Sequence, residues 1–232
     1  MRRLLRKLGY ELVKTKKDPN LDTFLRNYFK RVHVDVVIDI GANIGQFGKK
    51  LRSLGYRGEI YSFEPVSESY RRLLKNSKND LNWFAFNYGF AEESGDAIIN
   101  VSRSSDFSSI LDTNDFGTDF FSKKMSRQGT ENIKLRRFDS FYSEQNFQDQ
   151  SLLMKLDTQG YDLSVLRGSV NSLSAIGAIL TETAFIPIYS GMPLFDDIRS
   201  FVEKYDFKLS FMFPVSKNAK GQIIETDSFF TK

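Results

Sequence analysis

The sequence lacks cysteine entirely and has a single histidine, His33. Without cysteine, disulfides, thiolate catalysis and cysteine-based metal sites are excluded. With one histidine, neither a Ser-His-Asp triad nor a metal site built from several histidines is expected. The chain also has no run of about 18 apolar residues that could span a bilayer, and its N-terminus lacks the apolar block and cleavage site of a secretory signal. These absences predict a cytoplasmic protein.

What the chain does contain is an ordinary globular composition, 41% hydrophobic and 27% charged over 232 residues. This length predicts one catalytic-sized domain with a substantial core. The net charge of +4 is unevenly placed, because residues 1–17 carry a net +6 and leave the remainder at −2. The basic character is therefore confined to a short segment, and no nucleic-acid partner is expected.

Leucines recur at roughly helical spacing among the charges of residues 1–17. This pattern predicts a basic N-terminal helical arm over residues 1–33, followed by the main domain over residues 34–232. The arm could lie peripherally on an anionic membrane surface or on a partner. It could equally dock on the main domain with its basic face in solvent.

Beyond residue 20 the hydrophobic pattern predicts a helix over residues 21–32 and then alternating strands and helices. Strands are expected near residues 36–40, 59–63, 82–86, 151–156 and 178–182, and helices near residues 45–54, 67–76, 163–173 and 195–205. This alternation predicts an α/β fold, a mostly parallel sheet with helices on both faces. Residues 207–215 and 221–231 follow each other closely and predict a C-terminal antiparallel hairpin.

Residues 96–150 depart from the alternation. Two candidate strands, AIINVS and IKLRRFDSF, enclose a long polar stretch rich in Ser, Asp and Phe. An insertion of this length is usually functional or mobile. It is interpreted either as a lid over the site or as a surface excursion without chemical importance.

Four predicted strands end in a carboxylate, namely Asp39, Glu64, Asp157 and Glu182. One such acid could be a helix cap or the partner of a neighbouring lysine. Ligands of open parallel sheets bind outside the carboxyl ends of the strands. Four acids at that edge therefore predict one acidic site.

The segment DIGANIG, residues 39–45, turns the first predicted strand sharply into a helix. Dinucleotides, nucleoside triphosphates and S-adenosylmethionine all use such turns, but this one lacks the Gly-Lys-Ser/Thr of a P-loop and has Asn43 in place of the second dinucleotide-binding glycine. S-adenosylmethionine carries no phosphate and has a cationic sulfonium that carboxylates would favour. Glu64 stands where an acid accepts ribose hydroxyls in either an S-adenosylmethionine or an NAD enzyme, so it does not decide between them.

Five segments follow one another along the chain in the order DIGANIGQF, SFEPV, GFAEESG, KLDTQGYDLSVLRG and ETAFIPIYSGMP. In this order and spacing the chain resembles the FkbM-type family of S-adenosylmethionine-dependent methyltransferases over roughly residues 34–232. The resemblance implies a Rossmann-like class I methyltransferase fold with a seven-stranded sheet. It also implies O-methylation of a sugar, or of a polysaccharide or glycolipid precursor, as the activity.

The resemblance also implies which residues bind the cofactor. They are Asp39, Gly41, Asn43 and Gly45 at its methionine end, Glu64 at the ribose, and Asn87, Gly89 and Phe90 at the adenine. Asp157 is placed beside the methyl-transfer point. Many relatives have the sequence Asp-x-Glu-Gly here, whereas this chain has Gln159 in place of the glutamate. A role as general base that is assigned to that glutamate therefore cannot be carried over to this chain.

A hydroxyl acceptor must lose its proton during methyl transfer, and Asp157 and Glu182 are the candidate general bases, with Asp157 preferred. Paired acids could also hold Mg²⁺, but two acids without a third ligand do not predict a metal site. The candidate contacts to a small-molecule or saccharide acceptor are Arg103, Ser105, Ser108, Tyr161 and Tyr189. The same serines could belong to an ordinary polar loop, and the tyrosines to the core.

Two other functions remain open from the sequence. The layout of strand, glycine turn and glutamate also suits an NAD-dependent oxidoreductase, although Asn43 disfavours pyrophosphate. Alternatively, the protein is a catalytically inactive binding module that is recruited to membranes through residues 1–17.

Overall fold

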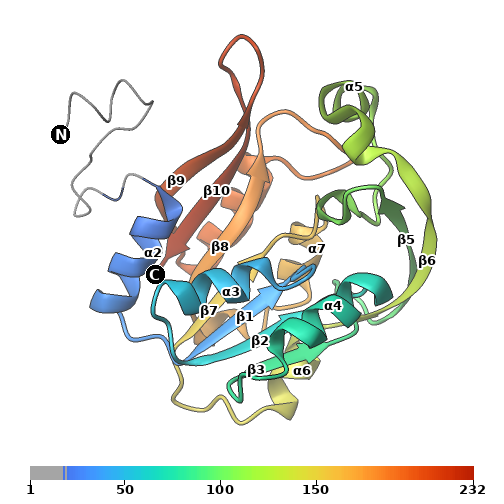
Figure 1. Ribbon diagram of the computed structural model, residues 1–232. Coiled ribbons are helices and arrows are strands. Elements are labelled where there is room, and N and C mark those ends of the chain that lie inside the picture. The colour runs from blue at the N-terminus through green and yellow to red at the C-terminus, as the bar shows by residue number, and fades with distance from the viewer. Residues whose placement is uncertain (1–17, 19) are drawn as a thin grey trace, which may run out of the picture.

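The computed structural model describes residue 18 and residues 20–232, so residues 1–17 and 19 of the arm expected over residues 1–33 lie outside the described residues. Its centre is a seven-stranded sheet with the order β3-β2-β1-β7-β8-β10-β9 (Figure 1). The strands are β1 (Val36–Ile40), β2 (Glu59–Phe63), β3 (Trp83–Phe86), β7 (Leu152–Leu156), β8 (Ile176–Ala184), β9 (Lys208–Lys217) and β10 (Ile223–Thr231). Strand β10 is antiparallel to both of its neighbours, and the other pairs are parallel. The prediction of a mostly parallel sheet with a C-terminal hairpin is confirmed.

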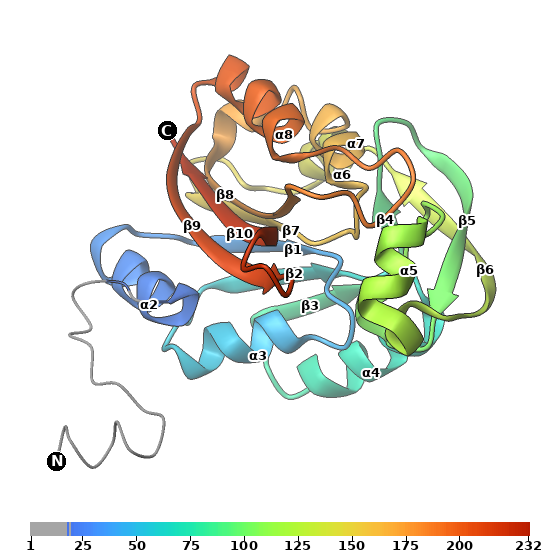
Figure 2. The same ribbon diagram turned by 90° about the horizontal axis from the view of Figure 1, so that it is seen from above.

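Helices cover both faces of this sheet, as Figure 2 shows from above. One face carries α2 (Leu21–Arg31), α3 (Gln46–Ser53) and α4 (Ser67–Ser77). The other face carries α6 (Phe138–Glu144), α7 (Asp162–Arg167) and α8 (Phe195–Val202). No helix among the described residues is long and apolar enough to cross a membrane.

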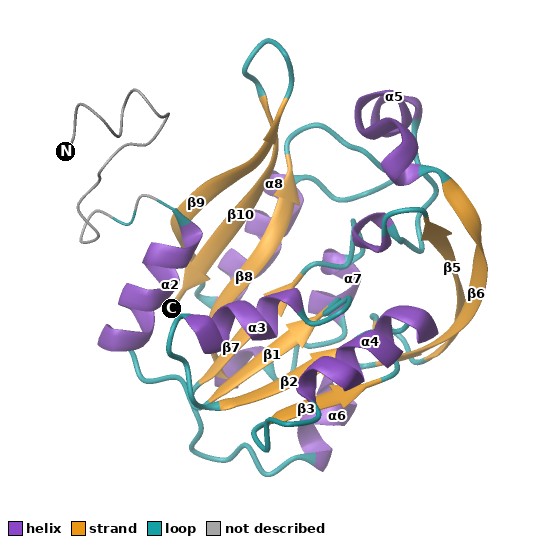
Figure 3. Ribbon diagram, in the orientation of Figure 1, coloured by secondary structure: helices purple, strands orange, loops and turns teal. Residues whose placement is uncertain are grey.

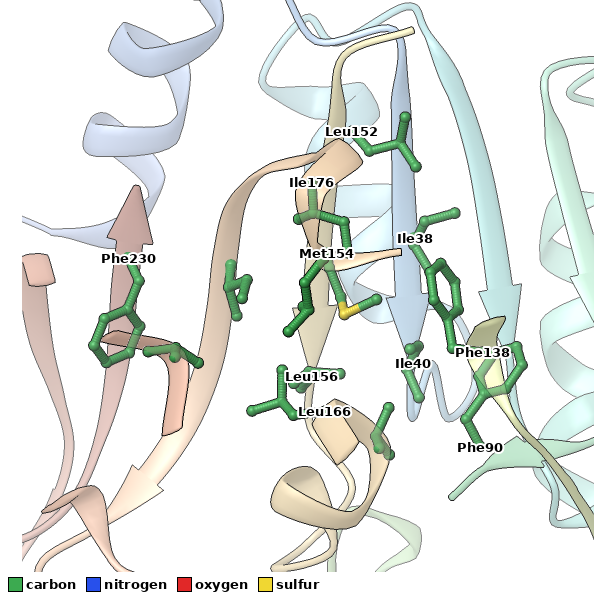
Figure 4. Close-up of a cluster of buried hydrophobic side chains, with 14 of the residues drawn as sticks. Ile38, Ile40, Phe90, Phe138, Leu152, Met154, Leu156, Leu166, Ile176 and Phe230 are labelled. Carbon is green, nitrogen blue, oxygen red and sulfur yellow. The ribbon is translucent and has the colours of Figure 1, made fainter. Parts of the chain in front are cut away.

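The two faces are buried because successive residues of a strand point to opposite sides. Ile38 and Ile40 of β1 pack with Met154 and Leu156 of β7 under the helices α6–α8, in the cluster drawn in Figure 4. Val37, the residue before Ile38, belongs to a second cluster on the α2–α3 face. All five residues of β1 are buried, as expected for a central parallel strand.

Helix α2 is part of the second cluster. Phe24 and Tyr28 lie on the ring of Phe229 in β10, with ring centroids 4.8 and 4.9 Å apart, and Leu25 is fully buried. Asn20 begins the helix by accepting a hydrogen bond from the Thr23 backbone N–H. The predicted helix over residues 21–32 therefore packs against the hairpin at the other end of the chain.

The insertion after β3 forms a second, three-stranded sheet beside the main one (Figure 3). Its order is β4-β6-β5, with β4 (Gly89–Phe90), β5 (Gly95–Ser102) and β6 (Arg127–Arg136). Between β5 and β6 lie the 3₁₀ turn η2 (Ser105–Phe107) and the helix α5 (Asp115–Phe121). The candidate strand AIINVS lies within β5 and is confirmed, whereas of IKLRRFDSF only residues 133–136 lie in β6 and the rest leads into α6.

One predicted helix is wrong at its end. The apolar pattern predicts a helix over residues 163–173, but α7 ends at Arg167. Gly168 follows, and a Cβ at that position would lie 2.0 Å from the carbonyl oxygen of Ala91. The chain leaves the helix where its backbone meets the loop after β4, a tertiary contact that periodicity cannot reveal.

Candidate active site

The carboxyl ends of the parallel strands border a cavity of about 660 Å³. Its wall combines residues that follow β1, β2 and β7 with residues of β8, β10 and η2. Six carboxyl side chains and three lysines line it, namely Glu64, Asp106, Asp157, Glu182, Glu225, Asp227, Lys50, Lys124 and Lys155. The balance of charged groups around the cavity is therefore acidic.

The loop after β1 forms the floor of one end. Gly41 has a φ of +77°, and a Cβ there would lie 1.9 Å from the carbonyl oxygen of Asp157. Asn43, with a φ of +47°, donates its backbone N–H to Glu64 Oε2 at 2.8 Å. Both positions need a conformation that few residues adopt, and glycine and asparagine are those that tolerate it.

Glu64 ties this loop to the segment after β2. Its second oxygen, Oε1, accepts the backbone N–H of Val66 at 2.8 Å, so both oxygens are bonded. Burial raises the pKa of Glu64 to about 7, although the two N–H groups and the charge of Lys155 act in the opposite direction. The carboxyl group is thus held rigidly at the edge of the cavity and titrates near neutrality.

Asp39 lies behind the cavity wall, fully buried. Its Oδ2 accepts the hydroxyl of Ser62 at 3.0 Å, and Ser62 in turn accepts the indole N–H of Trp83 at 2.9 Å. The Nζ of Lys155 lies 3.2 Å from Asp39 Oδ1 and 3.3 Å from Asp157 Oδ2. Burial alone would lower the pKa of Lys155, but the charges of Asp157 and Asp39 outweigh it and raise that pKa.

Lys155 was missed by the sequence reasoning. It stands opposite Asp39 in the register of β1 and β7, and two residues before Asp157, which places it on the same face of the sheet. That spacing in the segment KLD was the available signal. Lys155 neutralises the buried Asp39 and orients Asp157.

The candidate bases Asp157 and Glu182 are joined by one side chain. Gln159 Nε2 donates to Asp157 Oδ1 and to Glu182 Oε2, each at 3.0 Å. Gln159 Oε1 accepts the hydroxyl of Tyr189 at 2.8 Å. The structure therefore brings two of the five sequence motifs, KLDTQGYDLSVLRG and ETAFIPIYSGMP, together at one point.

Strand β10 adds two acids that the sequence reasoning also missed. Asp227 stands opposite Glu182 in the antiparallel register, and Glu225 lies two residues earlier on the same face. Burial first, and then the charge of Asp157, raises the pKa of Glu182, of Glu225 and of Asp227, the last to about 6. In the segment IIETDSFF, the two acids are separated by one residue, and this alternation was the available signal that both lie on the same face of β10.

The remaining predicted residues fall into two groups. Gly89, Phe90, Ser105, Ser108 and Tyr161 line the cavity, together with Gly41, Asn43, Glu64, Asp157 and Glu182. Asp39, Gly45, Asn87, Arg103 and Tyr189 are not among its lining residues. Asn87 donates to the carbonyls of Glu64 and Pro65, Arg103 is exposed, and Tyr189 is buried behind Gln159.

The insertion borders the cavity through Asp106 on η2. Asp106 Oδ1 accepts the side-chain amides of Asn43 at 2.6 Å and of Gln46 at 3.0 Å. The turn thus touches the loop after β1 across 60 or more residues of sequence. In the described part of the chain, no group of three or more His, Cys, Asp or Glu side chains is placed to hold a metal ion.

Residues 39–209 match the methyltransferase FkbM domain. The chain belongs to this family. The prediction made from the five ordered motifs is confirmed. The match spans the loop after β1, both candidate bases and the inserted sheet, and ends in β9.

The chain is also similar to the hexuronic acid methyltransferase AglP of Haloferax volcanii, with 27% identity over 149 residues. The aligned part covers 64% of this chain and 55% of AglP, so the chain spans about half the length of the relative that it matches.

Two solved structures are similar to this chain. Magnesium protoporphyrin IX methyltransferase (ChlM) of Synechocystis, solved with bound SAM, aligns with a TM-score of 0.50 at 10% identity, over 99% of this chain and 89% of that one. Fibrillarin of Aeropyrum pernix, also with bound S-adenosyl-L-methionine, aligns with a TM-score of 0.48 at 12% identity, over 90% and 74% of the two chains. The family match and the strand order together confirm the Rossmann-like methyltransferase fold.

Proposed function

We propose that this protein is an S-adenosylmethionine-dependent methyltransferase that acts on a hydroxyl oxygen of a saccharide or saccharide-containing precursor. One observation carries the proposal. In a member of the FkbM methyltransferase family, three of the four strand-end acids, Glu64, Asp157 and Glu182, line one acidic cavity together with the loop after β1.

The residues present fit the proposed cofactor. Asn43 Oδ1 is buried and has no hydrogen-bond partner among the described residues, in a loop whose backbone lines the cavity. Glu64 is positioned at the end of the second strand, where an acid accepts ribose hydroxyls. The acidic lining favours a ligand with a cationic sulfonium and no phosphate. Asn43 and Glu64 would hold its methionine and ribose parts, with Gly89 and Phe90 near the base.

When bound, S-adenosylmethionine supplies a methyl group on a sulfonium, ready for in-line displacement by an acceptor oxygen. The protein must position that oxygen, exclude water and accept the hydroxyl proton. Asp157 and Glu182 can take that proton, because both line the cavity and are within reach of the same Gln159 amide. Burial raises the pKa of Glu182, which makes its carboxylate a stronger proton acceptor than an ordinary one.

The acceptor end of the cavity favours an uncharged, hydroxyl-rich group. Glu182, Glu225 and Asp227 line it together with Ser216, whose hydroxyl donates to Glu225 Oε2 at 2.7 Å. Carboxyl groups accept hydrogen bonds from sugar hydroxyls and repel another carboxylate. The relative AglP is named for hexuronic acid, whereas this wall supports a neutral sugar as the acceptor here.

Calorimetric titration with S-adenosylmethionine, S-adenosylhomocysteine and NAD tests the cofactor. The first two are expected to bind and NAD is not. Binding of NAD without binding of the other two compounds would refute the proposal and would favour the alternative function, an NAD-dependent oxidoreductase. Transfer of a labelled methyl group to neutral glycosides then tests the acceptor class.

The membrane contact predicted for residues 1–17 stays a prediction. Co-sedimentation of the full chain with anionic liposomes, compared with a variant that lacks residues 1–17, checks it. Equal co-sedimentation of the two proteins would contradict it.

A further inference from the structure

Gln159 is held in an unusual conformation. Its φ is +54°, a left-handed value that is uncommon outside glycine, and Gly160 follows with a φ of +90°. The hydroxyl of Ser109, from the inserted sheet, donates to the Gln159 carbonyl at 2.7 Å. The backbone is therefore fixed from the insertion as well as from β7.

The orientation of its amide is fixed too. Tyr189 OH donates to Gln159 Oε1 at 2.8 Å and also approaches the carbonyl of Phe107 at 3.1 Å. At the opposite end, Nε2 faces one oxygen of each candidate base. Reversing the amide would set its oxygen against two carboxyl groups, so the hydrogen-bond network admits one orientation.

We propose that Gln159, oriented by Tyr189, is a positioning residue that holds the carboxyl groups of Asp157 and Glu182 as paired proton acceptors beside the methyl-transfer point. The inference rests on the proposed function. It assigns a role to a glutamine at the position where many members of the family have an acid, and it makes Tyr189 a support for that glutamine.

The charged surroundings explain why an uncharged donor is needed there. Several titratable groups face the Gln159 amide from the packed elements: Lys155 and Asp157 from β7 and its end, Asp162 from α7, Glu182 from β8, and Glu225 and Asp227 from β10. Lys155 is already shared between Asp39 and Asp157. A third carboxyl group between Asp157 and Glu182 would have to share a proton with them. The two N–H bonds of Gln159 instead stabilise the ionised form of both.

The experiment compares the affinity for S-adenosylmethionine with that for S-adenosylhomocysteine, which differs by the sulfonium charge and the methyl group. Calorimetry gives both dissociation constants for each protein between about pH 5.5 and 9. The affinity ratio should rise with pH as Glu182, whose pKa burial raises, ionises. The midpoint of that rise therefore reports the ionisation of Glu182, without requiring a known acceptor.

Three variants make the comparison. Gln159→Leu removes both N–H bonds, and the midpoint is expected to move up by about one pH unit. Tyr189→Phe keeps the ring packing but frees the amide to rotate, and a smaller shift in the same direction is expected. Gln128→Leu, an exposed glutamine on β6, is the matched control and should leave the midpoint unchanged.

The outcomes separate the two proposals. If the wild type binds neither compound, the proposed function fails. If the wild type binds both but its ratio does not vary with pH, or if Gln159→Leu and Tyr189→Phe keep the wild-type midpoint, the role of Gln159 is refuted. Should Gln159→Leu fail to fold by circular dichroism, the shift in Tyr189→Phe decides alone.

Discussion

At the β1–β2 end of the cavity, each carboxyl oxygen of Asp39 and Glu64 lies against a hydrogen-bond donor or a cation of the protein, whereas the acids at the β8–β10 end have fewer partners. Asp39 has Ser62 and Lys155, and Glu64 has two backbone N–H groups. In the part of the chain that the structure describes, Asp227 has no hydrogen bond or ion pair, and neither Glu182 nor Glu225 is paired with a Lys or Arg.

The difference separates two uses of a buried carboxyl group. Acids with internal partners fix the backbone of the loop that would receive the cofactor. Acids without a cationic partner leave their charge to be balanced by whatever occupies the cavity, since burying an unpaired charge is costly. The predictions below are ordered from the largest expected effect to the smallest.

Replacing Lys155 by Met should have the largest effect, because it leaves Asp39 buried without a cation. The free energy of unfolding is expected to fall by about 3–5 kcal/mol, measured by urea denaturation. Lys49→Met, at an exposed position of α3, is the matched control and should change it by less than about 0.5 kcal/mol. An equal loss in the free energy of unfolding of the two variants would contradict a stabilising ion pair between Lys155 and Asp39.

Replacing Gly41 by Ala should be nearly as damaging. The new Cβ would overlap the carbonyl oxygen of Asp157 at a positive φ, so a loss of about 2–3 kcal/mol is expected together with loss of S-adenosylhomocysteine binding. Gly55→Ala is the control, because its φ is +96° but its Cβ would meet no atom within 4 Å. If both variants behaved alike, backbone strain alone would explain the loss, without the close contact.

Stability without ligand should fall as pH rises from about 4.5 to 7. Burial raises the pKa of Glu64 from 4.5 to about 7, so in this window the native protein holds a proton that the unfolded chain has released. The acids of β8 and β10 act in the same direction. Melting temperatures measured across this range check the sign. In Glu64→Gln, the fall in the free energy of unfolding between pH 4.5 and 7 should be smaller than in the wild type by roughly 2 kcal/mol, measured by urea denaturation. An unchanged slope in that variant would show that Glu64 is not protonated.

The smallest effect concerns the acceptor. The wild type should methylate a neutral p-nitrophenyl glucoside at least about tenfold better than the matching glucuronide. The double variant Glu225→Gln and Asp227→Asn should narrow that preference, while Asp96→Asn, at an exposed position of β5, should not. Preference of the wild type for the glucuronide would overturn the assigned role of the acidic wall.

Local patterns predicted the strands, the hairpin and the row of acids in β1 and β8 and after β2 and β7, because alternation and strand ends are visible in the sequence. Lys155, Glu225 and Asp227 were missed because their roles depend on which strands are neighbours. The order of β7, β8 and β10 decides that Asp227 faces Glu182, and no local pattern states that order.

The inserted sheet shows the same limit. Its strands β5 and β6 pair across a polar stretch, and η2 reaches the loop after β1 through Asp106. Single-sequence reasoning left a lid and a surface excursion as equal alternatives for this region. The contacts of Asp106 with Asn43 and Gln46 place the turn η2 of this insertion at the cavity.

Trp83 is the one tryptophan in the chain, and its indole is bonded to Ser62, which is bonded in turn to Asp39. The same ring packs against the start of α3, where a Cβ at Gly45 or Gly48 would lie 3.0 or 2.2 Å from it. The tryptophan fluorescence of the protein therefore arises from a single place, directly beneath the loop that we propose to bind the cofactor. Filling of that loop can be followed by the colour and intensity of the protein's own emission, without a label.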